Sequence, residues 1–203
     1  MELREALTQI AEIRQQMARG QIFRGYRAAS TAFSGIVALL TGLLQVWWAA
    51  GHEMSVGEFV VPWVVAAILC VAVVGAEMVL RTRRSQSAVQ RQLTLLAVEQ
   101  FMPSMIAGGL LAWVFTQFMP QHYWMLPGLW MVVFALGVFA SARLLPREVF
   151  AIAGFYLLAG ITTLIITPAA GNLWLNVYMG AVFAAGQFAI AGILYYRLER
   201  NHG

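Results

Sequence analysis

The chain has 203 residues, of which 61% are hydrophobic and only 11% are charged. Soluble domains carry about 25% charged residues. A chain with so few charges could not cover its apolar surface in water, so we expect a membrane protein. All 13 basic residues are arginine, all nine acidic residues are glutamate, and a single cysteine excludes an internal disulfide.

Residues 2–19 have the pattern of an amphipathic helix outside the membrane. Its apolar stripe contains Leu3, Leu7, Ile10 and Met17, with Glu and Arg mostly on the other faces. These mixed charges differ from the strongly basic face of a helix lying on a membrane. The stripe could fold back under the rest of the chain, pair with a second copy, or dock a cytoplasmic protein. We assign residues 1–27 to this helix and a basic segment that follows it.

Six long apolar runs follow the first segment. A hydrocarbon core of about 30 Å requires about 20 residues of helix, and continuous runs favour helices over the alternating strands of a barrel. The sequence therefore predicts an all-α, integral membrane six-helix bundle over residues 28–196, with a short tail at 197–203. The expected spans are 28–50, 58–80, 98–118, 123–143, 147–168 and 173–196.

The arginines lie on one side of this predicted bundle. They precede the first span, follow the last, and occupy the second and fourth connections, whereas the other three connections contain none. The positive-inside rule then places both termini in the cytoplasm. The seven tryptophans fall near the opposite ends of the spans, as an outer interfacial belt would. The arginines expected to set orientation and attract anionic lipid are Arg81, Arg83, Arg84, Arg143 and Arg197.

The spans also suggest three helical hairpins, each running out and back. The second, fourth and sixth spans each carry a small residue six positions before an arginine. Such repetition occurs in transporters but also arises by duplication of a hairpin. Small residues predict close helix packing, and in the last span Ala181, Ala185 and Ala189 recur every four positions. We expect this stripe to pack inside the bundle, with a homo-oligomer interface as the alternative.

Polar residues within the spans are the candidates for a ligand site. Glu77 lies four residues before Arg81, a spacing that favours an ion pair at the inner interface over a proton or ligand site. Gln187, Tyr156 and Thr162 lie deeper, where uncharged polar groups usually form hydrogen bonds between helices. If the bundle holds a pocket, these residues, with Gln45 and Gln117, are its expected polar contacts.

No catalytic motif is present in the sequence. It lacks HExxH, Gly-x-Ser-x-Gly, a phosphate-binding Walker loop and Cys-x-x-Cys. His52, His122 and His202 do not have the spacing of metal ligands. The arginine-rich connection leads into a span and not into a nucleic-acid recognition domain. We therefore expect no enzyme activity, no metal or other cofactor, and no nucleic-acid partner.

The N-terminal region also resembles a known group of proteins. Its opening, followed directly by a span rich in small residues, is similar to bacterial multi-pass inner-membrane proteins of no assigned function. The resemblance covers about the first forty residues, beginning MELREALTQIAEIRQQMARGQIFRGYRA. It implies a location in the bacterial inner membrane and no particular activity.

Two functions are compatible with these observations. The first is a non-enzymatic inner-membrane component that associates with lipid, with itself, or with a protein partner through residues 2–19. The alternative is a small transporter, channel or sensor for a hydrophobic or neutral molecule. The scarcity of deep charges argues against ion-coupled transport, which generally uses carboxylates within the membrane. We prefer the first.

Overall fold

The computed structural model describes residues 28–51, 54–84, 88–141, 145–170 and 172–199. The predicted amphipathic helix and its stripe of Leu3, Leu7, Ile10 and Met17 lie outside these residues. The described chain is helical throughout, apart from its short connections. Its elements are α2 (Ala28–Ala49), α3 (Val56–Arg84), α4 (Ala88–Gln117), the 3₁₀ helix η1 (Pro120–Met125), α5 (Leu126–Ser141), α6 (Val149–Ala170), α7 (Asn172–Leu194) and the π-helical turn η3 (Tyr195–Glu199).

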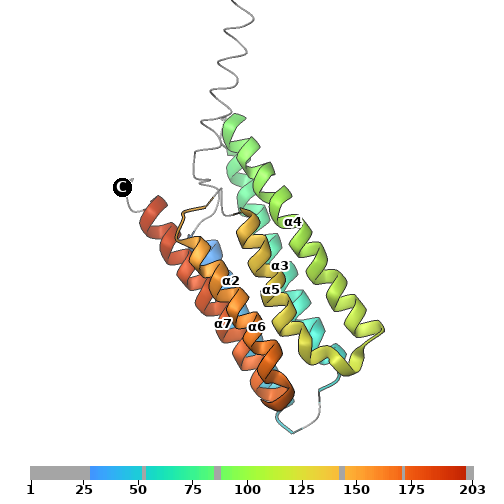
Figure 1. The fold of residues 1–203 in the computed structure, drawn as a ribbon. Coiled ribbons are helices and arrows are strands. Elements are labelled where there is room, and N and C mark those ends of the chain that lie inside the picture. The colour runs from blue at the N-terminus through green and yellow to red at the C-terminus, as the bar shows by residue number, and fades with distance from the viewer. Residues whose placement is uncertain (1–27, 52–53, 85–87, 142–144, 171, 200–203) are drawn as a thin grey trace, which may run out of the picture.

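The helices form one bundle in which successive elements run in opposite directions (Figure 1). The start of α2 and the end of α7 therefore lie at the same end, as an even number of spans requires. This is also the end near which α3 finishes and α4 begins, and there both project beyond the other helices (Figure 1). We call it the arginine end, because Arg83, Arg147 and Arg197 lie in or beside the helix ends found there.

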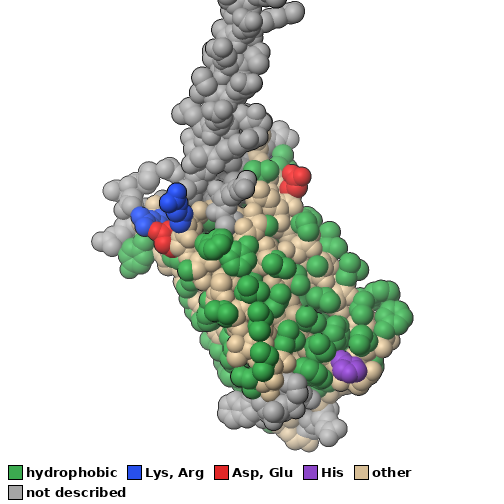
Figure 2. Space-filling model, in the orientation of Figure 1, with side chains coloured by type: hydrophobic (Ala, Val, Ile, Leu, Met, Phe, Trp, Pro, Cys, Tyr) green, Lys and Arg blue, Asp and Glu red, His purple; other side chains and the backbone are tan. Residues whose placement is uncertain are grey.

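In the described part of the chain, six helices are long and apolar enough to cross a membrane, as the sequence predicts for residues 28–196. Hydrophobic side chains cover the flank of the bundle, and the charged ones in view lie near the arginine end (Figure 2). The chain is therefore a multi-pass membrane protein with an all-helical bundle. The spans are Ala28–Ala49, Val56–Leu80, Leu95–Gln117, Pro120–Ser141, Val149–Thr167 and Leu175–Arg197.

The most extensive contact in the bundle joins its first and last spans, α2 and α7. The two helices approach closely where glycines face each other. A Cβ on Gly42 would lie 2.7 Å from the backbone oxygen of Asn176, and one on Gly180 would lie 3.0 Å from that of Ala38. Only hydrogen fits at these two positions, as in the small-residue contacts of other membrane helices.

A second close crossing joins α5 and α6. Here Gly128 and Gly160 face each other, and a Cβ on Gly160 would lie 2.7 Å from the backbone oxygen of Gly128. The predicted stripe on α7 has a different place. Ala181 and Ala185 are exposed, so the expectation that they pack inside the bundle was wrong; Gly180 and Ala184, one position before each, are buried instead.

The most extensive pairings, α2 with α7 and α5 with α6, join helices from different predicted hairpins. Contacts between neighbours in sequence complete a ring in which α3 packs against α2 and α4, and α4 against α5. Within this ring α5 and α7 have the most buried spans, at 44% each, whereas only 11% of the α4 span is buried. The division into three hairpins stays a prediction.

Candidate functional site

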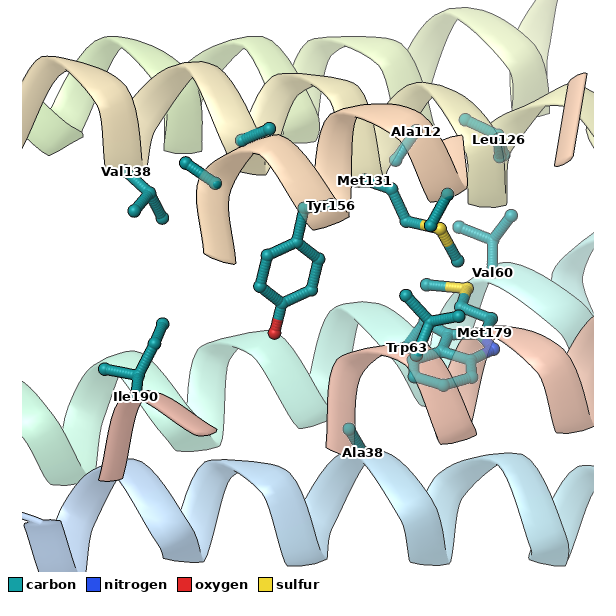
Figure 3. Packing of buried hydrophobic residues seen from close by; sticks show 14 of the residues in the cluster. Ala38, Val60, Trp63, Ala112, Leu126, Met131, Val138, Tyr156, Met179 and Ile190 are labelled. Carbon is teal, nitrogen blue, oxygen red and sulfur yellow. The ribbon is translucent and has the colours of Figure 1, made fainter. Parts of the chain in front are cut away.

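Tyr156 lies at the centre of the candidate site. Its side chain is fully buried and reaches from α6 into the middle of the bundle, with Met131 and Met179 to one side and Ile190 to the other (Figure 3). The tyrosine ring packs directly on Gly186 of α7, where an added Cβ would overlap it. Tyr156 is therefore held in place by a glycine that leaves room for its ring.

The hydroxyl of Tyr156 is used within the bundle. It donates a hydrogen bond of 3.0 Å to the backbone oxygen of Phe183 on α7. The side chain of Gln187, one turn further along α7, lies close to the same hydroxyl. Gln187 also packs against α2, since its Cβ lies 3.1 Å from the position that a Cβ on Gly35 would take. The structure thus brings two predicted site residues together where α2, α6 and α7 meet.

Aromatic rings surround this tyrosine. Phe134 of α5 meets its ring edge-on with a centroid distance of 4.9 Å, and Phe183 lies at 5.4 Å. Phe134 and Phe183 also contact each other at 5.5 Å. Such tilted pairs are favourable beyond the area they bury. The aromatic cluster, together with the hydrogen bonds of Tyr156, makes this level of the bundle a packed core.

The structure does not bring the other two predicted site residues to this cluster. Thr162 lies six residues after Tyr156, which turns it about 120° round α6. It is exposed, and its hydroxyl donates to the backbone oxygen of Leu158 in its own helix at 2.7 Å. Glu77 is half-buried on α3, a helix that packs mainly against α2 and α4.

Of the five arginines predicted at the inner surface, two have described side chains. Both Arg83 and Arg197 are exposed. Arg197 forms an ion pair with Glu148, which lies just before α6. The pKa of Glu148 is lowered by its own backbone N–H and then by the Arg197 guanidinium. Arg81 and Arg84 belong to α3, and their side chains, like the whole of Arg143, lie outside the described part.

A second polar cluster lies at the opposite end of the bundle, around Gln45 of α2. Gln45 is only 3% exposed, and its amide nitrogen donates to the backbone oxygens of Glu58 and Phe59 on α3. Its amide oxygen accepts a hydrogen bond of 2.6 Å from the indole of Trp63. Pro62 explains the need for this contact, because a proline removes the N–H that would otherwise bond to the carbonyl of Glu58. Gln45 thus replaces a missing helix hydrogen bond and ties α2 to α3.

The start of α3 is fixed by a reciprocal cap. The backbone N–H of Ser55 donates to the carboxylate of Glu58 at 2.7 Å, while the N–H of Glu58 donates to the Ser55 hydroxyl at 3.3 Å. This is a capping box, which the sequence Ser-x-x-Glu signals at residues 55–58. The Trp48 indole also donates to Glu58 at 3.4 Å. The cap orients the first turn of α3 so that its carbonyls face Gln45.

Trp63 changes the interpretation of the tryptophan belt. Trp47, Trp48 and Trp113 are exposed, as residues at a membrane interface would be. Trp63 is only 6% exposed and belongs to the core. Trp130 is half-buried, and its indole donates to the backbone oxygen of Gly108 on α4 at 3.0 Å. The belt expected from the sequence therefore divides into outward-facing residues and residues that join helices.

Four buried polar atoms in the described chain lack a hydrogen-bond partner: Gln100 Oε1, His122 Nδ1, Ser141 Oγ and Asn176 Oδ1. Asn176 lies beside the Gln45 cluster and is 1% exposed, with only a long contact of 3.6 Å from its amide nitrogen to the sulfur of Met54. Buried polar groups are usually paired. Each of these atoms is therefore a place where a ligand or water could supply the missing bond.

The comparisons with known proteins give no relative for this chain. No family model, no curated protein and no solved structure matches it. Within the described residues, no group of three or more His, Cys, Asp or Glu side chains could hold a metal ion. The function must therefore be argued from the geometry alone.

Proposed function

We propose that this chain is a non-enzymatic multi-pass protein of the bacterial inner membrane, with both termini in the cytoplasm, that acts by association. Its partners would be lipid, further copies of itself, or a protein that docks on residues 2–19. The observation that carries the proposal is the packed centre of the bundle. Of the best candidates for ligand contacts, Tyr156 bonds to the bundle itself, and Gln187 packs against α2 beside it.

The outer surface supports the same proposal. The α4 span is 11% buried and the α3 span 22% buried, so both leave most of their apolar side chains open to the surroundings. In a membrane, lipid or another apolar helix covers such a surface. Orientation with the arginine end inward follows from the positive-inside rule, and Arg83 and Arg197 are both exposed there.

Native mass spectrometry of the protein, released gently from its own membrane, tests this function. We expect a defined oligomer or a co-purifying protein, with bound lipid but no stoichiometric small solute. A variant with Leu7→Glu and Ile10→Glu should lose a cytoplasmic partner while the bundle stays folded. Glu12→Gln, which leaves the apolar stripe intact, is the matched control. A monomer that carries only a small solute would contradict the proposal.

A second candidate function is a transporter, channel or sensor for a hydrophobic or neutral molecule. The specific observation in its favour is Asn176, whose buried amide oxygen has no partner among the described residues. Replacing Gln187 or Asn176 by leucine should then abolish retention of the molecule without unfolding the bundle. Gln117→Leu, the same type of change at an exposed position, should leave retention unchanged.

A further inference from the structure

The seam between α4 and α5 is aligned by a close contact near the arginine end. A Cβ on Gly137 of α5 would lie 2.9 Å from the Cβ of Ser104 and 2.8 Å from the ring of Phe101, both on α4. The two helices run in opposite directions (Figure 1). One turn further toward the arginine end, the same faces carry Ser141 on α5 and Gln100 on α4. The helical repeat therefore places Ser141 and Gln100 opposite each other across the seam.

Both of these side chains have an oxygen without a partner. Ser141 is 2% exposed, and neither its Oγ nor the Oε1 of Gln100 has a hydrogen-bond partner among the residues that the structure describes. The two could satisfy each other directly, because a serine hydroxyl donates and an amide oxygen accepts. They do not, although they share one seam. A buried pair of this kind is costly unless a third group bridges it.

Pro103 leaves a further acceptor in the same turn of α4. A proline within a helix removes the N–H that would bond to the carbonyl four residues earlier. That carbonyl belongs to Glu99, the residue next to Gln100. In membrane proteins, backbone groups freed in this way are satisfied by side chains, neighbouring helices or ordered water. Glu99 and Pro103 are both exposed, so this carbonyl lies on the open flank of α4, next to the seam. Within the seam the two unpaired groups are Gln100 Oε1 and the Ser141 hydroxyl.

The depth of the site limits the chemistry of its ligand. Gln100 lies five residues, or about 8 Å, inside the apolar span that begins at Leu95. A cation there would need a buried counter-charge, but Glu99 is exposed. A neutral hydroxyl group fits the available atoms better. It can donate to an acceptor and accept from the Ser141 hydroxyl, and a buried water typically forms about three such bonds.

We propose that the α4–α5 seam is a binding site for one neutral hydroxyl group, held between Gln100 and Ser141. The group belongs either to a water molecule or to an alcohol, such as the hydroxyl of a lipid that enters along the open flank of α4. Its role is to fill the polar gap between these two side chains. The proposal is independent of the proposed function.

The sign of a stability change tests whether the site is occupied. We would compare the unfolding of the full-length wild type and Ser141→Ala in detergent micelles. If a hydroxyl is bound, the alanine variant leaves it without a partner, and the unfolding equilibrium constant should rise about fivefold to tenfold. If the site is dry, removal of an unpaired hydroxyl should leave stability unchanged or increase it. Ser104→Ala, one turn away in the same seam, is the matched control.

A crystal structure of the wild type in a lipid mesophase gives an independent readout. An isolated density peak within hydrogen-bond distance of Gln100 Oε1 and Ser141 Oγ identifies water, whereas continuous density leading out along α4 identifies an alcohol. Either result supports the proposal. A direct bond between Gln100 and Ser141 with no third group would overturn it. The proposal would also be overturned if sodium stabilised the folded protein and choline, used in its place, did not.

Discussion

The bond network of Gln45 makes the sharpest prediction about stability. Gln45→Leu keeps a similar side-chain volume but removes every polar atom. The indole N–H of Trp63 would then be buried without its acceptor, and the carbonyl of Glu58 would lose the amide bond that replaces the missing N–H of Pro62. The carbonyl of Phe59 still has the backbone N–H of Trp63 within its own helix. The substitution therefore removes a hydrogen bond that matters from two groups.

Two general magnitudes bear on the size of this effect. An unpaired buried polar group costs about 1–3 kcal/mol in soluble proteins. Hydrogen bonds between membrane helices average only about 0.6 kcal/mol, with a maximum of about 1.7 kcal/mol, because the unfolded state in the membrane also finds partners. With two groups affected, we expect Gln45→Leu to lower the free energy of unfolding by about 2 kcal/mol.

A double-mutant cycle with Trp63→Phe measures the part that belongs to the indole bond. The phenylalanine variant has no N–H for Gln45 to satisfy, so the double variant should lose about 1 kcal/mol less than the two single losses added together. The assay is equilibrium unfolding in mixed micelles, with Gln117→Leu as the control at an exposed position. Strict additivity, or a loss below about 0.5 kcal/mol for Gln45→Leu, would refute the reasoning.

Three further predictions concern the centre of the bundle and the arginine end. Gly186→Ala should destabilise the fold by about 3 kcal/mol, because the new methyl group overlaps the ring of Tyr156; thermal unfolding would show this, and the loss should be smaller when it is measured in a Tyr156→Ala background, where the ring is absent. Thr162→Val should change the melting temperature little, because this exposed hydroxyl bonds only within its own helix. The ion pair of Glu148 with Arg197 should stabilise the folded state at pH values above the ordinary glutamate pKa of 4.5, and this contribution should disappear as the pH falls through the lowered pKa of Glu148. The pH dependence of unfolding should therefore be weaker in Glu148→Gln.

The glycine prediction has a control elsewhere on α6. Gly154 has no atom within 4 Å of the position that a Cβ would take. Gly154→Ala should therefore be tolerated or slightly stabilising, since alanine has the higher helix propensity. Equal destabilisation by the two glycine substitutions would contradict the argument from close packing.

The positions of the spans follow from the sequence because a continuous apolar run has one favourable place, the hydrocarbon. The first span was expected at 28–50 and is found at Ala28–Ala49. The second and third helices are longer than the spans they contain, since α3 continues to Arg84 and α4 begins at Ala88. A helix can continue beyond the membrane through polar residues, so the length of a span does not determine the length of its helix.

The contacts between the spans could not be predicted in the same way. A helix that is apolar on all sides has no amphipathic pattern to mark its buried face. In α7, Ala181 and Ala185 have the same spacing of four as Gly180 and Ala184, yet only the second pair is buried. The difference arises from α2. Its glycines let the backbone of α7 pack directly on α2 at Gly180 and Ala184, which buries that face of α7. Such a contact depends on two segments that are far apart in the sequence, so neither segment predicts it alone.

The candidate site, too, could be predicted only in part from the sequence. Tyr156 and Gln187 were chosen as deep polar residues, and they do meet, but nothing in the sequence connected them to Gly186. The role of Gln45 had a signal that could be read: Pro62 implies a free carbonyl at Glu58, and Ser55 with Glu58 forms a capping box. Its partner Trp63 was expected at the membrane interface and is instead in the core.

The pairing of α2 with α7 also determines when the bundle can be completed. During synthesis α2 enters the membrane before α7, so the face of α2 that contains Gly35 and Gly42 has no α7 to pack against while α3, α4, α5 and α6 are made. Until then lipid or an insertion factor must cover that face, and truncation before α7 would leave an open arc of helices. We expect such truncated chains to be recognised as incomplete and degraded. Once α7 is present, each helix of the ring has a neighbouring helix on both sides.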